Sequence, residues 1–236
     1  MPDNIPNMRI VLLLLSFAAI LTAKEKARTC RILFPNAPQQ TAETYYLFDG
    51  QKSQQVTLPR LSFSPVYQLL PGDIKIRLLT TPVNKPEQIP SGFPEATVDA
   101  ATKDIYLVVT TDPTNTALPL RLQVVNANHD RIRLGEMLWI NLTPKHLAGK
   151  VGRSSLTLAP NAFAMVKEPA TSAGDYPLEI YFRVPGDDRT HPLIESQWHH
   201  DPRSRFVVFV YDEGRRRAPR IMSFSDFRIP ERNENE

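Results

Sequence analysis

Ile74-Lys75-Ile76-Arg77-Leu78 alternates apolar and charged residues at every step. Successive side chains of an extended chain point to opposite sides, so the apolar residues share one face and the charged residues the other. This is the pattern of a β-strand that covers a core with one face and meets water with the other. The stretch is therefore predicted to be a strand, and the rest of the chain is interpreted from it.

Similar short segments recur on both sides of this stretch. They are rich in Val, Ile, Leu and aromatic residues and end at Pro, Gly, Asp or Asn. The predicted strands are 31–34, 44–48, 55–58, 66–70, 74–79, 105–110, 120–125, 137–141, 155–158, 163–167, 178–183, 206–211 and 221–224. The chain has 22 prolines, which cannot fit inside many helices. Only 94–103 and 143–147 leave room for a short helical turn, so the fold class is predicted to be all-β.

A repeat of about 100 residues is the second signal of organisation. When the chain is shifted by 100 positions, Phe63 falls on Phe163, Val66 on Val166 and Val108 on Val208. We predict two tandem immunoglobulin-like β-sandwich modules related by this repeat, at 30–127 and 132–230, followed by a disordered tail at 231–236. Two unrelated all-β domains that share turn residues by chance are the alternative.

The N-terminus carries an export pattern. Met8-Arg9 precedes an apolar run from Ile10 to Ile20, and Leu21-Thr22-Ala23 supplies a small residue for cleavage. Residues 1–23 are predicted to be a signal peptide and the protein to be secreted or periplasmic. The run is shorter than the roughly 20 residues that span a bilayer, so no stable membrane span is expected after signal cleavage. Positive residues directly after the run leave open whether the signal is cleaved or retained as an anchor.

Charge and cysteine content exclude some classes of protein. The net charge is only +3, and its one dense run, Arg215-Arg216-Arg217, follows two acidic residues in the manner of a hairpin tip. No nucleic-acid partner is expected, because such binders gather Lys and Arg on one face. The single cysteine, Cys30, excludes an intramolecular disulfide and is predicted to be a buried apolar residue of a strand.

Two long polar insertions, 81–102 and 185–204, are the expected binding regions, since long loops are often functional. The second contains His191, His199, His200 and Asp201, which are the candidate metal ligands. A candidate binding surface consists of Trp198, Arg215 and Arg216.

No motif for a catalytic residue or a cofactor is present, so no cofactor is expected. The leading hypothesis is an exported, non-enzymatic β-sandwich protein of the cell envelope that acts by binding or scaffolding. Its partner would be an unidentified protein or polysaccharide. The alternatives are a secreted hydrolase or metal-binding protein that uses the loop of His191, His199 and His200, and a carbohydrate-binding module that uses Trp198. Asn141-Leu142-Thr143 fits a glycosylation motif, which matters only in a eukaryotic secretory pathway.

Three turn motifs in residues 30–125 are similar to those of uncharacterised bacterial extracellular β-sandwich domains. They are Ile32-Leu33-Phe34-Pro35-Asn36-Ala37-Pro38, Leu47-Phe48-Asp49-Gly50 and Tyr67-Gln68-Leu69-Leu70-Pro71-Gly72. The first lacks the spacer residue that these domains carry before the proline. The resemblance implies a location in the cell envelope and brings no catalytic residues.

Overall fold

The computed structural model describes residues 27–38, 44–213 and 217–227. The predicted signal peptide, the predicted tail, Arg215 and Arg216 lie outside these residues. The strands are β1 (Arg28–Leu33), β2 (Tyr45–Phe48), β3 (Ser53–Val56), β4 (Tyr67–Leu69), β5 (Ile74–Leu79), β6 (Glu95–Val98), β7 (Asp104–Thr111), β8 (Leu120–Asn126), β9 (Met137–Asn141), β10 (His146–Val151), β11 (Ser154–Leu158), β12 (Phe163–Val166), β13 (Gly174–Arg183), β14 (His191–His200), β15 (Arg205–Tyr211) and β16 (Arg220–Asp226). One 3₁₀ turn, η1 (Pro86–Gln88), is the only helical element in this part of the chain, so the predicted all-β class is confirmed.

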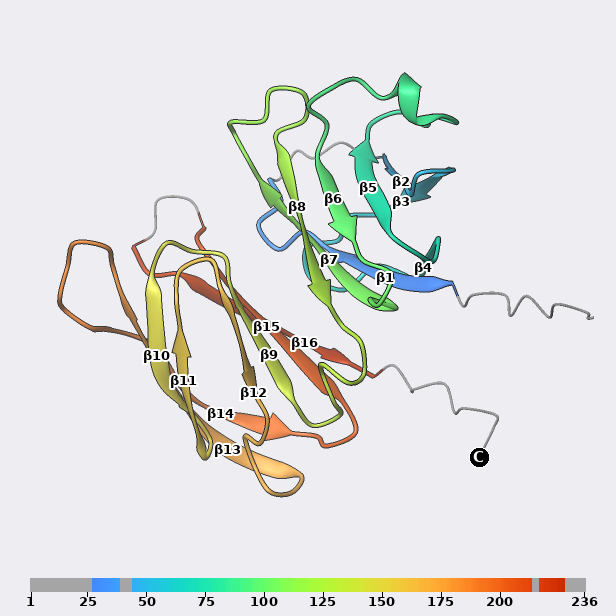
Figure 1. Ribbon diagram of the computed structural model, residues 1–236. Coiled ribbons are helices and arrows are strands. Elements are labelled where there is room, and N and C mark those ends of the chain that lie inside the picture. The colour runs from blue at the N-terminus through green and yellow to red at the C-terminus, as the bar shows by residue number, and fades with distance from the viewer. Residues whose placement is uncertain (1–26, 39–43, 214–216, 228–236) are drawn as a thin grey trace, which may run out of the picture.

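The strands form four sheets of four strands each (Figure 1). We call β1–β8 the first module, with an outer sheet β3-β2-β5-β6 and an inner sheet β4-β1-β7-β8. The second module, β9–β16, has an outer sheet β11-β10-β13-β14 and an inner sheet β12-β9-β15-β16. Each inner sheet contains one parallel pair, β1 with β7 and β9 with β15. The strand order of the second module therefore matches that of the first strand by strand, in agreement with two β-sandwich modules in tandem.

The gapless alignment of the predicted repeat is wrong in these parallel strands. Val108 packs in the core between the two inner sheets, whereas Val208 packs inside the second module. A shift of one residue turns every side chain of a strand to its other face. Matching Leu107 with Val208 instead places both residues in the core of their own module.

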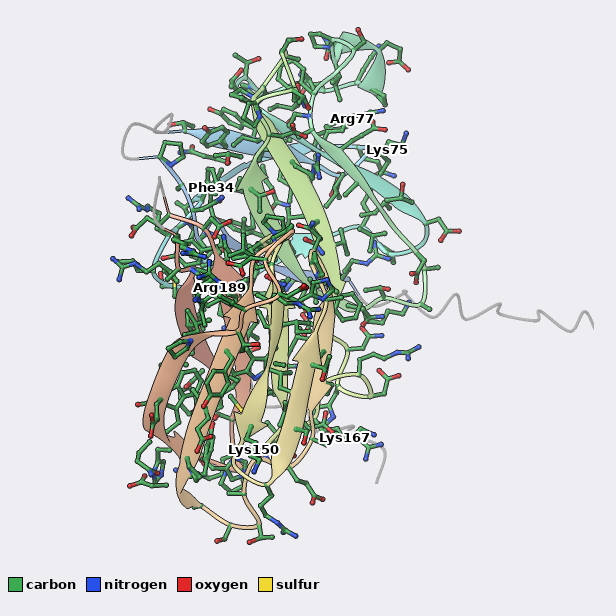
Figure 2. The ribbon with its side chains drawn as sticks, turned by 90° about the vertical axis from the view of Figure 1, so that its left-hand side faces the viewer. Phe34, Lys75, Arg77, Lys150, Lys167 and Arg189 are labelled. Atoms are coloured by element: carbon green, nitrogen blue, oxygen red, sulfur yellow. The ribbon has the colours of Figure 1, made fainter. Side chains whose placement is uncertain are left out.

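Each module closes a hydrophobic core between its two sheets. In the first module this core includes Cys30, which is fully buried in β1, so the prediction for the single cysteine is confirmed. Trp139 is fully buried in the core of the second module, as expected for an apolar strand. The two modules lie one beyond the other, with Lys75 and Arg77 on the first and Lys150 and Lys167 on the second (Figure 2).

A third core lies between the two inner sheets and joins the modules. Tyr106 and Val108 of β7 face Ile140 of β9 and Phe209 of β15 in this inter-module core. Phe63 stacks on Tyr106 with ring centroids 4.8 Å apart. The central strands β7, β9 and β15 are consequently buried on both faces, which explains why β9 and β15 are apolar without alternation.

A buried ionic cluster reinforces this contact. The Asp226 carboxylate, with no exposed side-chain surface, accepts hydrogen bonds from Arg205 Nη2 at 2.7 Å, from Arg31 Nη1 at 3.2 Å and from the Tyr106 hydroxyl. Arg205 Nη1 also donates to the main-chain oxygen of Ala127, between the modules, at 2.7 Å. The last strand, the linker and the first module are thus held together by the carboxylate of Asp226 and the guanidinium groups of Arg205 and Arg31.

Three strands depart from the predictions. Of the segments that left room for a helical turn, 94–103 contains β6 and 143–147 overlaps the first two residues of β10. The insertion at 185–204 contains the ten-residue strand β14. These strands lack a run of β-branched and aromatic residues, and their pairing with β5 and β13 determines their conformation. No helix of the described residues is long and apolar enough to cross a membrane.

Candidate ligand-binding depression

The structure does not bring the four candidate metal ligands together. His191 and His200 lie at opposite ends of β14, roughly 30 Å apart at about 3.3 Å per residue. His199 faces outward and lies with Nδ1 2.8 Å from Asp175 Oδ1, whereas His200 is buried. Among the described residues, no group of three or more His, Cys, Asp and Glu side chains is placed to hold a metal ion.

Local polar contacts engage the first and last of the four candidate ligands in sequence, His191 and Asp201. His191 Nε2 lies 3.4 Å from Asp187 Oδ2, and Arg217 Nη2 donates to the same oxygen at 2.8 Å. Asp201 accepts a hydrogen bond from Arg203 Nε at 3.0 Å, and this bond is the main cause that lowers the pKa of the Asp201 carboxyl. These contacts stabilise the turns on either side of β14.

Trp198 belongs to the core, not to an exposed loop as predicted. It lies in β14, is half-buried and stacks on Trp139 with ring centroids 6.0 Å apart and planes 11° apart. Side chains alternate between the two faces of the sheet along β14, and this alternation directs the Trp198 ring inward. Trp198 is therefore unsuited to act as an external stacking platform.

The glycosylation motif is also turned inward. Asn141 is buried, and its Nδ2 donates to the main-chain oxygens of Lys145 at 2.7 Å and Ala159 at 2.9 Å. The amide nitrogen that would carry a glycan therefore belongs to the internal hydrogen bonding of the fold.

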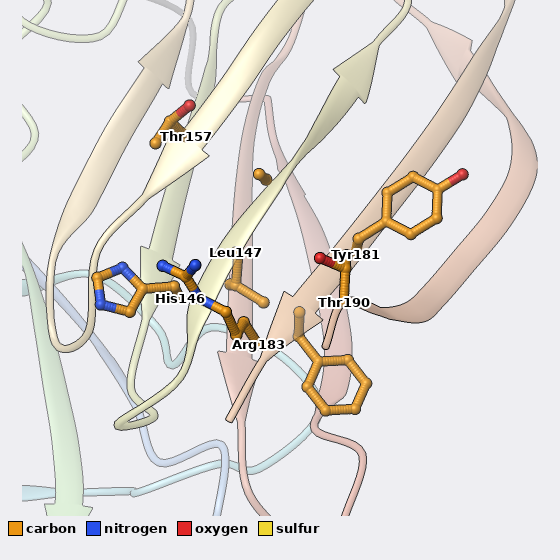
Figure 3. Close-up of a pocket in the computed structure, with 8 residues that line it drawn as sticks. His146, Leu147, Thr157, Tyr181, Arg183 and Thr190 are labelled. Atoms are coloured by element: carbon orange, nitrogen blue, oxygen red, sulfur yellow. The ribbon is translucent and has the colours of Figure 1, made fainter. Parts of the chain in front are cut away.

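The outward face of the second outer sheet carries a depression of about 230 Å³. Figure 3 shows the residues that line it, on β10, β11 and β13 and in the turn before β14. They are His146, Leu147, Ala148, Thr157, Tyr181, Phe182, Arg183 and Thr190. The side chain of Ala148 is a single methyl group, which leaves space between its larger neighbours.

Strand register sorts this face into three rows. His146 lies opposite Arg183, and two residues along the strands Ala148 lies opposite Tyr181. The next row holds a basic and an acidic residue, Lys150 opposite Glu179. Successive rows are roughly 7 Å apart, because each strand residue rises about 3.3 Å. The face thus runs from a basic row through an apolar row to a row of mixed charge.

Polar groups around the depression are available to a ligand. In the described part of the chain, the side chains of His146, Thr157, Tyr181, Arg183 and Thr190 form no hydrogen bond or ion pair with the protein. Tyr181 is 40% exposed although it is a large aromatic residue. No Asp or Glu lines the depression, and neither threonine hydroxyl is bonded to His146 as an activated nucleophile would be. The arrangement can recognise a molecule, but it lacks the parts of a hydrolytic centre.

No protein-family model matches this chain, and no curated protein matches it. The depression was not among the sites predicted from the sequence, although Tyr181 and Arg183 fall within the predicted strand 178–183. A large aromatic residue on the polar face of that strand was the available signal.

Proposed function

We propose that this chain is an exported, non-enzymatic protein of the cell envelope that binds a saccharide on its second outer sheet. The observation that carries the proposal is the depression, whose lining combines an exposed tyrosine with unpaired donors from Arg183, His146 and two threonines. An aromatic ring offers a flat apolar surface, and convergent polar groups fix the orientation of the ligand. A sugar ring presents the matching pair of surfaces, apolar C–H groups on its faces and hydroxyls around its edge.

The size of the site favours a saccharide over a folded protein partner. A depression of about 230 Å³ suits one small unit of a longer chain. The surrounding strands are rigidly paired, which lowers the ordering cost of binding. Location in the envelope is supported by the apolar run 10–20 and by the turn motifs of residues 30–125.

A hydrolase or metal site at His191, His199 and His200 is less well supported. Such a site needs convergent side chains, and β14 separates His191 from the other two by most of its length.

The test is binding of the purified protein to a glycan array, followed by calorimetric titration with the saccharides that bind. Tyr181→Ala should weaken binding at least tenfold, because the stacking surface is lost. Tyr46→Ala is the matched control, since Tyr46 lies on the outward face of the other outer sheet, and it should bind as the wild type does. Wild-type protein that binds no glycan, or a Tyr181→Ala variant that binds like the wild type, overturns the proposal.

A further inference from the structure

We infer that the saccharide carries an anionic group, a carboxylate or a sulfate, and that Arg183 and His146 receive it. This inference rests on the proposed function and specifies the class of ligand. It follows from how charge is distributed across the three rows of the second outer sheet.

The basic row provides a receptor for an anion at one end of the depression. His146 and Arg183 are direct cross-strand neighbours, and Figure 3 shows their side chains close together on the same side of the sheet. Cross-strand neighbours have Cβ atoms about 5 Å apart, so both heads can reach one ligand group. A guanidinium group presents two parallel N–H donors to a carboxylate or sulfate, which gives short, charge-assisted hydrogen bonds. Arg183 makes no such contact within the described protein, so its donors are free for the ligand.

The row at the other end of the face, which contains Lys150 and Glu179, repels an anion. Glu179 lies opposite Glu195 of β14 on one side and opposite Lys150 of β10 on the other. Two carboxylates and one ammonium group leave this row with a net negative charge. An anionic ligand is repelled there and attracted to Arg183, about 14 Å away, which fixes the direction in which it binds.

Between these rows lies the surface that holds the sugar ring. Tyr181 has Ala148 on one side and Pro192 on the other in the strand register. The three form an apolar strip across three neighbouring strands, without a charged side chain. A pyranose ring seated on this strip can direct an exocyclic carboxylate toward Arg183 and its hydroxyls toward Glu179.

Three trisaccharides of the same linkage test the inference by calorimetric titration at low and high salt. They are a trisaccharide of glucuronic acid, its glucose counterpart, and the glucose counterpart carrying sulfate. We expect one of the two anionic probes to bind at least tenfold more tightly than the glucose probe, with an advantage that shrinks as salt screens the charges. Comparison of the carboxylate and sulfate probes identifies which anion the site takes.

Variants assign the preference to the basic row. Arg183→Gln should weaken binding of the anionic probe much more than binding of the glucose probe, so that the two affinities come to lie within about twofold of each other. Arg153→Gln is the matched control, because Arg153 is an exposed arginine in the turn at the far end of the β10–β11 hairpin, and it should retain the preference. Circular dichroism of both variants verifies the fold.

Three outcomes overturn the inference, and they differ in what they say of the proposed function. If the anionic and neutral probes bind with equal affinity and Tyr181→Ala still abolishes this binding, the ligand need not be anionic but the proposed saccharide site stands. A preference that survives Arg183→Gln shows that the anion binds elsewhere. Failure of all three probes together with an empty glycan array overturns the inference and the proposed function alike.

Discussion

Replacement of Asp226 by asparagine should be among the most destabilising polar substitutions in this protein. Asparagine keeps the volume of the side chain and removes its charge. The carboxylate has no exposed side-chain surface, and Arg205, whose side chain is 4% exposed, donates to it at 2.7 Å. Asp226→Asn therefore leaves a buried guanidinium group without its closest counter-charge.

The expected cost follows from the surroundings of Arg205. Removing one partner of a buried ion pair typically costs about 3–5 kcal/mol. Asp104 Oδ2 also lies near Arg205, at 3.5 Å, and offsets part of the loss. We expect the lower end of the range, about 3 kcal/mol, which for a chain of this size lowers Tm by about 6–12 °C.

Urea unfolding followed by circular dichroism measures this cost through linear extrapolation of the free energy of unfolding. Glu95→Gln is the control, because Glu95 binds Lys75 and Arg77 at the surface with 44% of its side chain exposed. Exposed pairs contribute about 1 kcal/mol or less. Both variants should unfold in one transition, since the inter-module core couples the modules. An Asp226→Asn variant no less stable than Glu95→Gln would refute the reasoning.

Three further predictions concern the second outer sheet. Trp198→Ala should cost about 2–4 kcal/mol in urea unfolding because the ring packs on Trp139; an unchanged midpoint would show that Trp198 is a surface residue. Burial lowers the pKa of His200, so the unfolded chain binds the proton more tightly than the folded chain does. The free energy of unfolding should therefore fall as pH drops below about 6.5, and it should fall less in His200→Gln. Equal pH profiles of the variant and the wild type would contradict this. Gly149→Ala should disrupt pairing of β10 with β13, because a Cβ at this position would overlap the main-chain oxygen of Glu179. Hydrogen exchange should then show loss of amide protection in these two strands. Protection equal to that of the wild type would contradict this prediction.

Much of the fold follows from local patterns in the sequence. Ile74–Leu79 has the bounds predicted from its alternation, and Met137–Asn141 has those predicted from its apolar run. The strand β10 was missed because Gly149 occupies an inward position, where the close approach of β13 leaves no room for a side chain. The alternation of apolar residues is therefore broken in the middle of that strand.

The inter-module core has a signal in the sequence of β15. Val207, Val208, Phe209 and Val210 are all fully buried, and such a run is typical of a strand covered on both faces. An isolated sandwich would place alternate residues of this strand in water. The run therefore indicates a second layer, although it does not identify the sheet that provides it.

The candidate site could not be derived from local sequence. His146 and Arg183 are neighbours only because β10 and β13 pair in one particular register across 37 positions of chain. Long-range register depends on the packing of the whole module, whereas the histidines of 191–200 stood out because they are close in sequence. Their proximity along the chain suggested a common site, but a single extended strand holds His191 far from His199 and His200.

The inter-module core also has a consequence for the order of events during synthesis. The first module is complete about 80 residues before β15 emerges, which at 5–20 residues per second is a delay of roughly 4–16 s. Throughout that interval Tyr106, Val108 and Val125 form an apolar sheet face that the first module covers only in part, by Phe63 stacked on Tyr106. A nascent chain halted near residue 127 should therefore be retained by chaperones or aggregate, and the second module acts as the intramolecular cover that ends this exposure.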